Sequence, residues 1–190
     1  MRQVSQAGLL VVWRVEPVRR VLILMGSDSD LPVMKGAVEA LSELGIPYEI
    51  HIASAHRTPE KAMRLAATAA AEGYGVLIAG AGGAAHLPGV LAAATTLPVI
   101  GVPIASGALN GVDALYAIVQ MPRGIPVATV AIDGAYNAGL LAAQMLAISD
   151  DELAERLASY RHRLAEQVEA KDRRLSEAGV TGYLTQKKSE

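Results

Sequence analysis

Residues 21–45 read VLILMGSDSDLPVMKGAVEALSELG, and this stretch decides the fold. Its first five residues form a continuous apolar run, which is typical of a parallel strand buried on both faces. A polar turn from Gly26 to Asp30 follows, and a helical pattern then runs from about Pro32 to Leu44, where Gly45 ends it. The stretch therefore predicts a strand, a turn and a helix, which is the repeating unit of an α/β fold.

The same unit recurs along the chain. Further strands are predicted at Tyr48–Ile52, Val76–Ala79, Val99–Val102 and Val127–Ile132. Helical patterns cover Thr58–Glu72, Ala84–Thr95, Val112–Gln120 and Tyr136–Leu146, the first with Thr58 as its capping residue and Pro59 after it. Five strands with helices between them predict a three-layer, doubly wound parallel sheet of the flavodoxin-like or Rossmann-like type.

A long C-terminal helix is predicted after this sheet. Ser149 to Glu152 has the pattern of a capping box, and a single apolar stripe follows at Leu153, Leu157, Tyr160, Leu164 and Val168. A helix from Asp150 to Ser176 would reach roughly 40 Å, which is longer than a small domain needs. It can pack across a neighbouring subunit or fold back on its own domain, and the sequence leaves both open.

The length of 190 residues suits one domain. We expect an N-terminal extension over residues 1–20, a single α/β catalytic domain including the C-terminal helix over 21–176, and a tail over 177–190. The apolar run at residues 9–13 is too short for a signal peptide, and no A-x-A cleavage site follows it. Apolar runs are everywhere interrupted before the roughly 18 residues that a membrane span requires, so we expect no membrane partner.

Composition narrows the function further. With 17 Lys and Arg against 19 Asp and Glu, the chain has no positive field for a nucleic-acid backbone, so we expect no nucleic-acid partner. The absence of cysteine excludes thiolate chemistry and fits a reducing cytosol, and we expect a cytoplasmic protein. Alanine and glycine exceed a quarter of the chain and phenylalanine is absent. A chain so poor in bulky side chains is expected to complete its burial as a homo-oligomer.

Ligands of open α/β sheets lie at the carboxyl ends of the strands, so the turns there are the candidates for chemistry. The first turn, Gly26 to Asp30, offers hydroxyl groups and backbone N–H groups at a helix N-terminus, which suit a phosphate, and carboxylates, which suit ribose hydroxyls. A capping turn without a ligand, or a weak Mg²⁺ site, is the alternative.

The second turn, residues 53–59, reads ASAHRTP and places His56 beside Arg57. Histidine can give and take a proton near neutral pH, and arginine offers a fixed fork of donors to a phosphate or carboxylate. The alternative is that His56 only hydrogen-bonds locally and Arg57 is a solvated charge.

The third turn, residues 80–89, reads GAGGAAHLPG and lets backbone N–H groups approach a flat or anionic ligand. It is no dinucleotide fingerprint, because it lacks the GxGxxG spacing and the acidic residue that follows. His86, a turn inside the predicted third helix, either catalyses or only orients the loop. His51 and His162 lie on a strand and on the long helix, where structural or solvent-facing roles are favoured.

Taken in order, these turns and three later segments resemble the 5-(carboxyamino)imidazole ribonucleotide mutases of purine biosynthesis. The resemblance covers roughly residues 21–170. It rests on the segments MGSDSD (25–30), SAHRTP (54–59), GAGGAAHLPG (80–89), PVIGVP (98–103), IVQMPRGIPV (118–127) and NAGLLAAQ (137–144).

The resemblance implies an isomerase of IMP biosynthesis that moves a carboxylate from the exocyclic nitrogen of the imidazole ribonucleotide to ring carbon four. It implies no cofactor, no metal, no ATP and no biotin, and a homo-octamer. His56 matches the general acid/base of the family. The matching nucleotide-binding positions are Ser27, Asp30 and Arg57, and the neighbours of the base are Ser54, Ala81, Gly82, Gly83 and His86.

Two positions depart from the family pattern, and a third has no interpretation. Ala81 stands where some members carry Asn, Ala105 stands where many carry Gln, and Asp133 cannot be interpreted from the sequence. Three other readings remain open. They are a binding module without catalysis, a structural shell protein, and a carboxylase that takes carbon dioxide directly.

Overall fold

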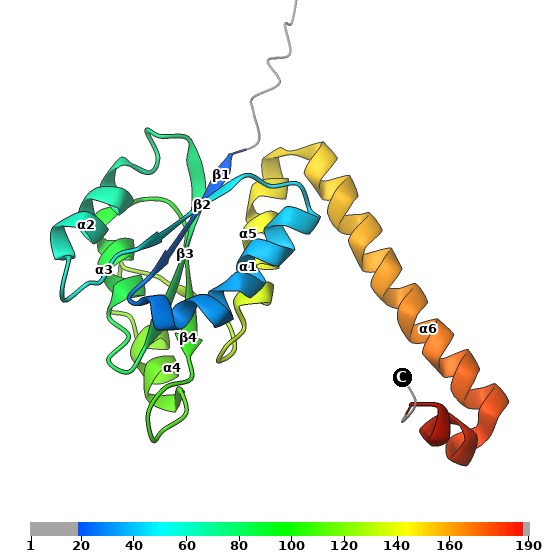
Figure 1. Ribbon diagram of the computed structural model, residues 1–190. Coiled ribbons are helices and arrows are strands. Elements are labelled where there is room, and N and C mark those ends of the chain that lie inside the picture. The colour runs from blue at the N-terminus through cyan, green and yellow to red at the C-terminus, as the bar shows by residue number, and fades with distance from the viewer. Residues whose placement is uncertain (1–18, 188–190) are drawn as a thin grey trace, which may run out of the picture.

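The computed structural model describes residues 19–187, whose centre is one five-stranded parallel sheet in the order β2-β1-β3-β4-β5 (Figure 1). This order has a single switch of direction beside β1, which is the flavodoxin-like form of the doubly wound sheet that the sequence predicts. The strands are β1 Arg20–Met25, β2 Tyr48–Ile52, β3 Tyr74–Gly82, β4 Val99–Ile104 and β5 Ala128–Thr129.

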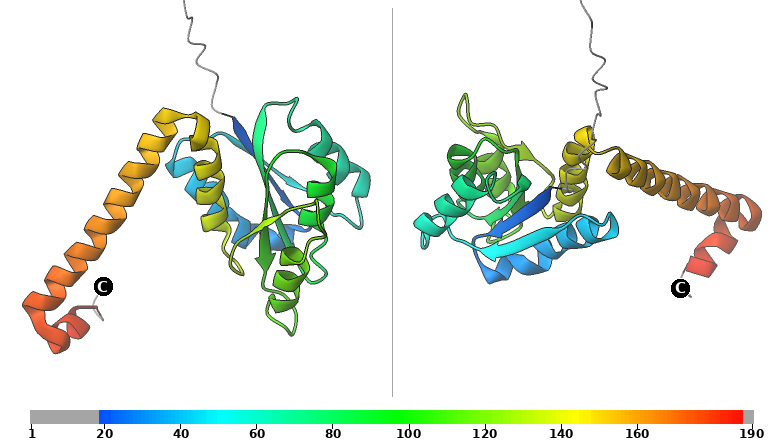
Figure 2. Two further views of the ribbon diagram at one scale, coloured as in Figure 1. Left: turned by 180° about the vertical axis from the view of Figure 1, so that it is seen from behind. Right: turned by 90° about the horizontal axis from the view of Figure 1, so that it is seen from above.

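Helices cover both faces of the sheet, so the three-layer prediction is confirmed (Figures 1 and 2). One layer holds α1 and α5, and the other holds α2, α3 and α4. The helices are α1 Leu31–Glu43, α2 Pro59–Thr68, α3 Leu87–Ala94, α4 Val112–Val119, α5 Ala135–Leu146 and α6 Asp151–Lys187, with 3-10 turns η1 Asp28–Asp30 and η2 Ala147–Ser149.

The apolar run of β1 is buried on both sides, as the sequence predicts. Val21, Ile23 and Met25 belong to the core shared with α1 and α5, whereas Leu22 and Leu24 belong to the core under α2, α3 and α4. All five side chains are at most 1% exposed. Alternation along one strand thus ties the two cores together and fixes the strand in the middle of the molecule.

One predicted helix start is wrong. The third helix begins at Leu87 and not at Ala84, because Ala85 has a left-handed backbone, φ +47°, which no α-helix accommodates. His86 therefore lies at the N-cap of α3 and not inside it. Thr58 is the N-cap residue of α2, as predicted, but its side chain makes no capping hydrogen bond, because its hydroxyl oxygen accepts the N–H of Ser54 at 2.9 Å instead.

Helices α1 and α5 pack closely through small residues. A Cβ on Gly139 would lie 2.8 Å from Ala40 Cβ and 2.9 Å from the Ala37 carbonyl oxygen, which is backbone and cannot turn away. We expect Gly139→Ala to lower the free energy of unfolding by about 1–3 kcal/mol through overpacking, measured as a shift in urea midpoint. Gly182→Ala is the control, since that Cβ meets only Ala178 Cβ at 3.3 Å. Equal midpoints for the two variants would contradict the packing argument.

The long helix α6 leaves the body of the molecule (Figures 1 and 2). Asp150 caps it, accepting the Leu153 N–H at 2.9 Å, so the cap predicted at Ser149 lies one residue later. Leu153 and Tyr160 are buried, whereas the stripe beyond them is exposed, with Val168 at 63%. The helix continues past the predicted end at Ser176 and has a non-helical residue at Gly179.

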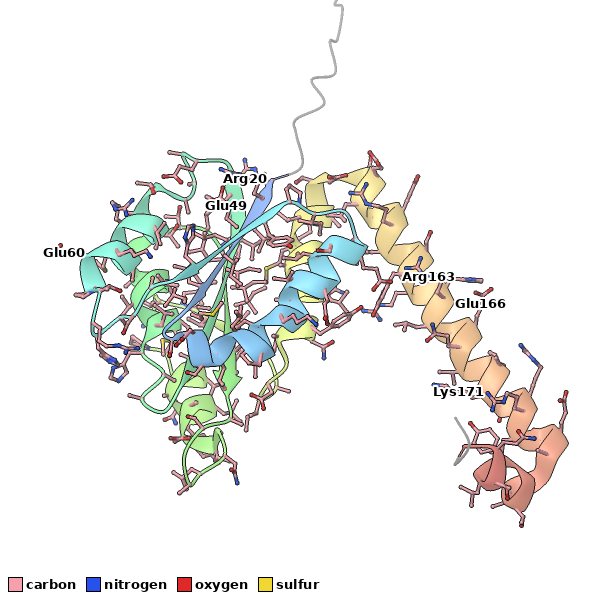
Figure 3. The ribbon with its side chains drawn as sticks, in the orientation of Figure 1. Arg20, Glu49, Glu60, Arg163, Glu166 and Lys171 are labelled. Carbon is pink, nitrogen blue, oxygen red and sulfur yellow. The ribbon has the colours of Figure 1, made fainter. Side chains whose placement is uncertain are left out.

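A polar cluster at the root of α6 holds it to α1 and α5. Tyr136 donates to Glu43 Oε2 at 2.8 Å, Arg163 donates to Glu43 Oε1 at 2.9 Å, and Tyr160 donates to the Tyr136 hydroxyl at 3.3 Å. These hydrogen bonds from Tyr136 and Arg163 lower the pKa of Glu43. Figure 3 shows Arg163 on the side of α6 that faces the body.

Residues 1–18, which make up nearly all of the predicted N-terminal extension, and residues 188–190 of the predicted tail lie outside the described residues. Between residues 19 and 187, no helix combines the length and the apolar character needed to cross a membrane.

Candidate active site

The three turns singled out in the sequence meet at one edge of the sheet. Strand register places Met25 beside Ile52 and Gly80, so β1, β2 and β3 deliver their turns at the same level. A pocket of about 330 Å³ lies there. Its lining contains every predicted site residue, namely Ser27, Asp30, Ser54, His56, Arg57, Ala81, Gly82, Gly83 and His86.

The first turn is a completed capping box. Ser27 Oγ accepts the Ser29 N–H at 3.3 Å, and Asp30 Oδ2 accepts the Ser27 N–H at 3.1 Å. Burial raises the pKa of the Asp30 carboxyl, against the hydrogen bonds from Ser27 and Ser29 that lower it. The capping alternative is therefore real, but the same residues line the pocket, so capping and ligand binding are compatible.

The second turn is built around Ser54, the one buried polar residue of the described core. Its hydroxyl oxygen accepts the N–H groups of His56 and Arg57 at 3.3 and 3.2 Å, and its own N–H donates to Thr58. This network fixes the backbone that carries the imidazole and the guanidinium. Arg57 Nη2 then donates to the Gly26 carbonyl at 3.0 Å, which brings the cation to the first turn.

The third turn brings a second imidazole to the first. His56 Nε2 lies 2.7 Å from His86 Nδ1, with the ring planes at 74°. A hydrogen bond needs one donor and one acceptor, so one of these facing nitrogens carries a proton and the other does not. The pair can hold and move a proton at the pocket wall, and both rings are exposed to a ligand that enters.

Ser106 is a pocket residue that sequence reasoning missed. It follows β4, and its Oγ accepts the Gly83 N–H at 3.1 Å, at a place where a Cβ on Gly82 would lie 2.7 Å from the same oxygen. The signal that could have found it is the rule used for the other turns, since Ser106 stands just beyond a predicted strand.

The opposite end of the sheet holds a second group of charged side chains, labelled Arg20 and Glu49 in Figure 3. Arg20 pairs with Glu49 and lies 4.4 Å from the Tyr74 ring centroid. Burial and the hydrogen bond with Glu49 raise the pKa of Tyr74 to about 12. The charges and hydrogen bonds of these three side chains are therefore paired with one another, at the end of the sheet opposite the pocket.

Within residues 19–187, no cluster of three or more His, Asp or Glu side chains could hold a metal ion. The pocket instead offers two imidazoles, a guanidinium, hydroxyls and glycine-rich backbone. These features define a flavodoxin-like α/β protein whose strand ends carry a pocket with groups chemically suited to binding an anion and moving a proton.

A sequence model of the AIR carboxylase family matches residues 20–167, and the chain belongs to that family. The chain is 60% identical to an N5-carboxyaminoimidazole ribonucleotide mutase of Pyrococcus horikoshii over 86% of its length and 93% of that protein. It is 56% identical to the protein of the same name from Thermotoga maritima, over 88% of its length and 98% of that protein.

A relative with another name is also similar. The chloroplastic phosphoribosylaminoimidazole carboxylase of Vigna aconitifolia is 53% identical over 85% of this chain, but only 29% of that protein is matched. Among solved structures, PurE of Treponema denticola superimposes with a TM-score of 0.75 at 33% identity, covering 82% of this chain and 97% of that one.

Proposed function

We propose that this chain is a 5-(carboxyamino)imidazole ribonucleotide mutase, an isomerase of purine biosynthesis. The observation that carries the proposal is the hydrogen-bonded pair of His56 and His86 beside Arg57 in one pocket. The mutases of Pyrococcus horikoshii and Thermotoga maritima support it, since they are matched over nearly their whole length.

His56 is the proposed general acid and base. As the carbamate C–N bond breaks, His56 gives its proton to the exocyclic nitrogen, and carbon dioxide and the aminoimidazole ribonucleotide are formed. Ring carbon four then attacks carbon dioxide, the C–C bond forms, and the proton on that carbon returns to His56. Protons therefore balance over the cycle without a cofactor. The hydrogen bond to His86 holds the imidazole in place.

The ribonucleotide is proposed to lie across the first two turns. Arg57 and Ser27 bind the phosphate, since Arg57 already reaches the first turn through the Gly26 carbonyl. Asp30 accepts hydrogen bonds from ribose hydroxyls. Ser54, His86 and the backbone of residues 81–83 border the base, where the glycine-rich backbone leaves room for carbon dioxide.

A substrate comparison tests the reaction. The carbamate nucleotide, supplied without ATP or bicarbonate, is expected to give the ring-carboxylated product rapidly, followed by absorbance. Aminoimidazole ribonucleotide with bicarbonate is expected to be a much poorer pair, because dilute carbon dioxide must then be captured from solution. If the second mixture reacts as efficiently at matched nucleotide concentration, the chain is a carboxylase instead. If neither reacts but the product nucleotide binds, it is a binding module.

The protein is further proposed to be a cytoplasmic homo-oligomer, an octamer. Large apolar side chains are exposed on α4, with Tyr116 at 59%, and along α6, with Val168 at 63%. Such surface is usually covered in soluble proteins. Light scattering at micromolar concentration is expected to give a mass several times that of one chain, and a truncation before Ser149 is expected to weaken the assembly. A monomeric mass would refute the oligomer.

A further inference from the structure

The loop after β4 reaches the pocket with little regular structure to hold it. Residues 105–110 are exposed, and three positions between 105 and 111 have positive φ, namely Gly107, Asn110 and Gly111. Through Ser106, nevertheless, this loop supplies the acceptor for the Gly83 N–H at the pocket wall. Its position must come from the contacts made at its two ends.

Both ends of the loop lie against the turn between β5 and α5. At the start, Asp133 Oδ1 accepts the Ala105 N–H at 2.9 Å, and the Asp133 N–H donates to the Pro103 carbonyl at 2.9 Å. At the far end, a Cβ on Gly111 would lie 2.8 Å from Ile132 Cγ2 and 3.0 Å from Ala105 Cα. Asp133 therefore contacts the loop where it begins, and Ile132 lies against the loop where it ends.

The backbone of Asp133 is itself unusual, with φ +56°. A left-handed conformation costs energy for a residue with a Cβ, although aspartate tolerates it better than most. The turn is tight, because the Gly134 N–H donates to the Ala131 carbonyl at 2.9 Å and a Cβ on Gly134 would lie 2.8 Å from that oxygen. From this turn the Asp133 carboxylate reaches the Ala105 N–H.

We propose that Asp133 is a positioning residue of the active site, which holds the start of the loop so that Ser106 meets the Gly83 N–H. The path runs from the Asp133 carboxylate through the Ala105 backbone to the next residue, Ser106, and from its hydroxyl to the glycine turn. Ala105 carries only a methyl group, so its backbone N–H is the donor by which this residue can be held. The kinetic part of the test rests on the proposed function.

Two substitutions separate the carboxylate from the turn. Asp133→Gly accepts the left-handed backbone but has no acceptor, whereas Asp133→Asn keeps an acceptor of the same reach and also tolerates positive φ. We expect Asp133→Gly to speed deuterium uptake in peptides that contain Ala105 and Gly83, and Asp133→Asn to leave it near that of the parent. This measurement needs no turnover. Unchanged uptake at the Gly83 peptide in Asp133→Gly would overturn the proposal.

The kinetic arm asks whether Asp133 acts through Ser106. With the carbamate nucleotide, Asp133→Gly and Ser106→Ala are each expected to lower kcat/KM by roughly three- to tenfold, and Asp133→Asn by less than about twofold. The double variant Asp133→Gly, Ser106→Ala is expected to lose little more than either single variant. Losses that multiply would mean that the two residues act independently, which overturns the proposal. An inactive parent would overturn the proposed function, and deuterium uptake would still decide the positioning role.

Discussion

His56→Asn is expected to lower kcat by about 10²–10⁴-fold, the usual contribution of a general acid/base, while the protein stays folded. Asparagine cannot give or take a proton near neutral pH, but it preserves a polar side chain in the turn that Ser54 fixes. The backbone N–H of residue 56 can still donate to Ser54 Oγ, so the turn should keep its shape. Steady-state turnover of the carbamate nucleotide measures the effect.

His162→Asn is the matched control for this substitution. His162 lies on α6 next to Glu166, outside the pocket, and its replacement should leave turnover unchanged. Thermal unfolding and calorimetry with the product nucleotide then show whether fold and binding persist in His56→Asn. Turnover within threefold of the parent would remove His56 from the proposed chemistry.

Arg57→Ala is expected to weaken binding of the product nucleotide by roughly 1.5–3 kcal/mol, the cost of one lost charge-assisted phosphate contact. This corresponds to about a 10- to 150-fold increase in Kd, measured by titration calorimetry. The substitution also removes the link from Arg57 Nη2 to the Gly26 carbonyl, so the first turn loses a partner on the second.

Two comparisons make the arginine experiment specific. Arg64→Ala removes a guanidinium from α2, outside the pocket lining, and should leave Kd unchanged. Raising the salt concentration should weaken binding by the parent more than binding by Arg57→Ala, because screening acts on the charge that the variant has lost. An affinity in Arg57→Ala equal to that of the parent would place Arg57 outside the phosphate site.

The order of elements could be predicted from the sequence because each buried strand is an apolar run followed by a polar turn. Boundaries failed where backbone conformation outweighed pattern. Residues 84–86 have helical composition, but the left-handed Ala85 delays α3 to Leu87. The strand expected over Val127–Ile132 is reduced to Ala128–Thr129, because the regular pairing with β4 ends there and the chain turns at Asp133, where φ is +56°.

The residues that line the pocket could be predicted because parallel strands bring the turns after them to one edge of the sheet. What could not be predicted were contacts that depend on distance in space. Asp133 accepts a hydrogen bond from the Ala105 N–H, 28 positions away in the sequence, and the residues around either position do not predict that bond. The closeness of His56 and His86, 30 positions apart, likewise required the strand register.

A small change of angle where α6 is attached to the body produces a large displacement at its far end. Arg163 is held by Glu43, and the stretch from there to Gly179 extends about 24 Å at the usual helical rise. A rotation of about 5° at the root would therefore move the far end by about 2 Å, which exceeds the tolerance of a well-packed contact. The hydrogen bonds among Glu43, Tyr136 and Tyr160 therefore fix the direction in which α6 leaves the body. Because none of these three side chains lines the pocket, substitutions of them are expected to shift the far end of α6 and to leave the pocket unchanged.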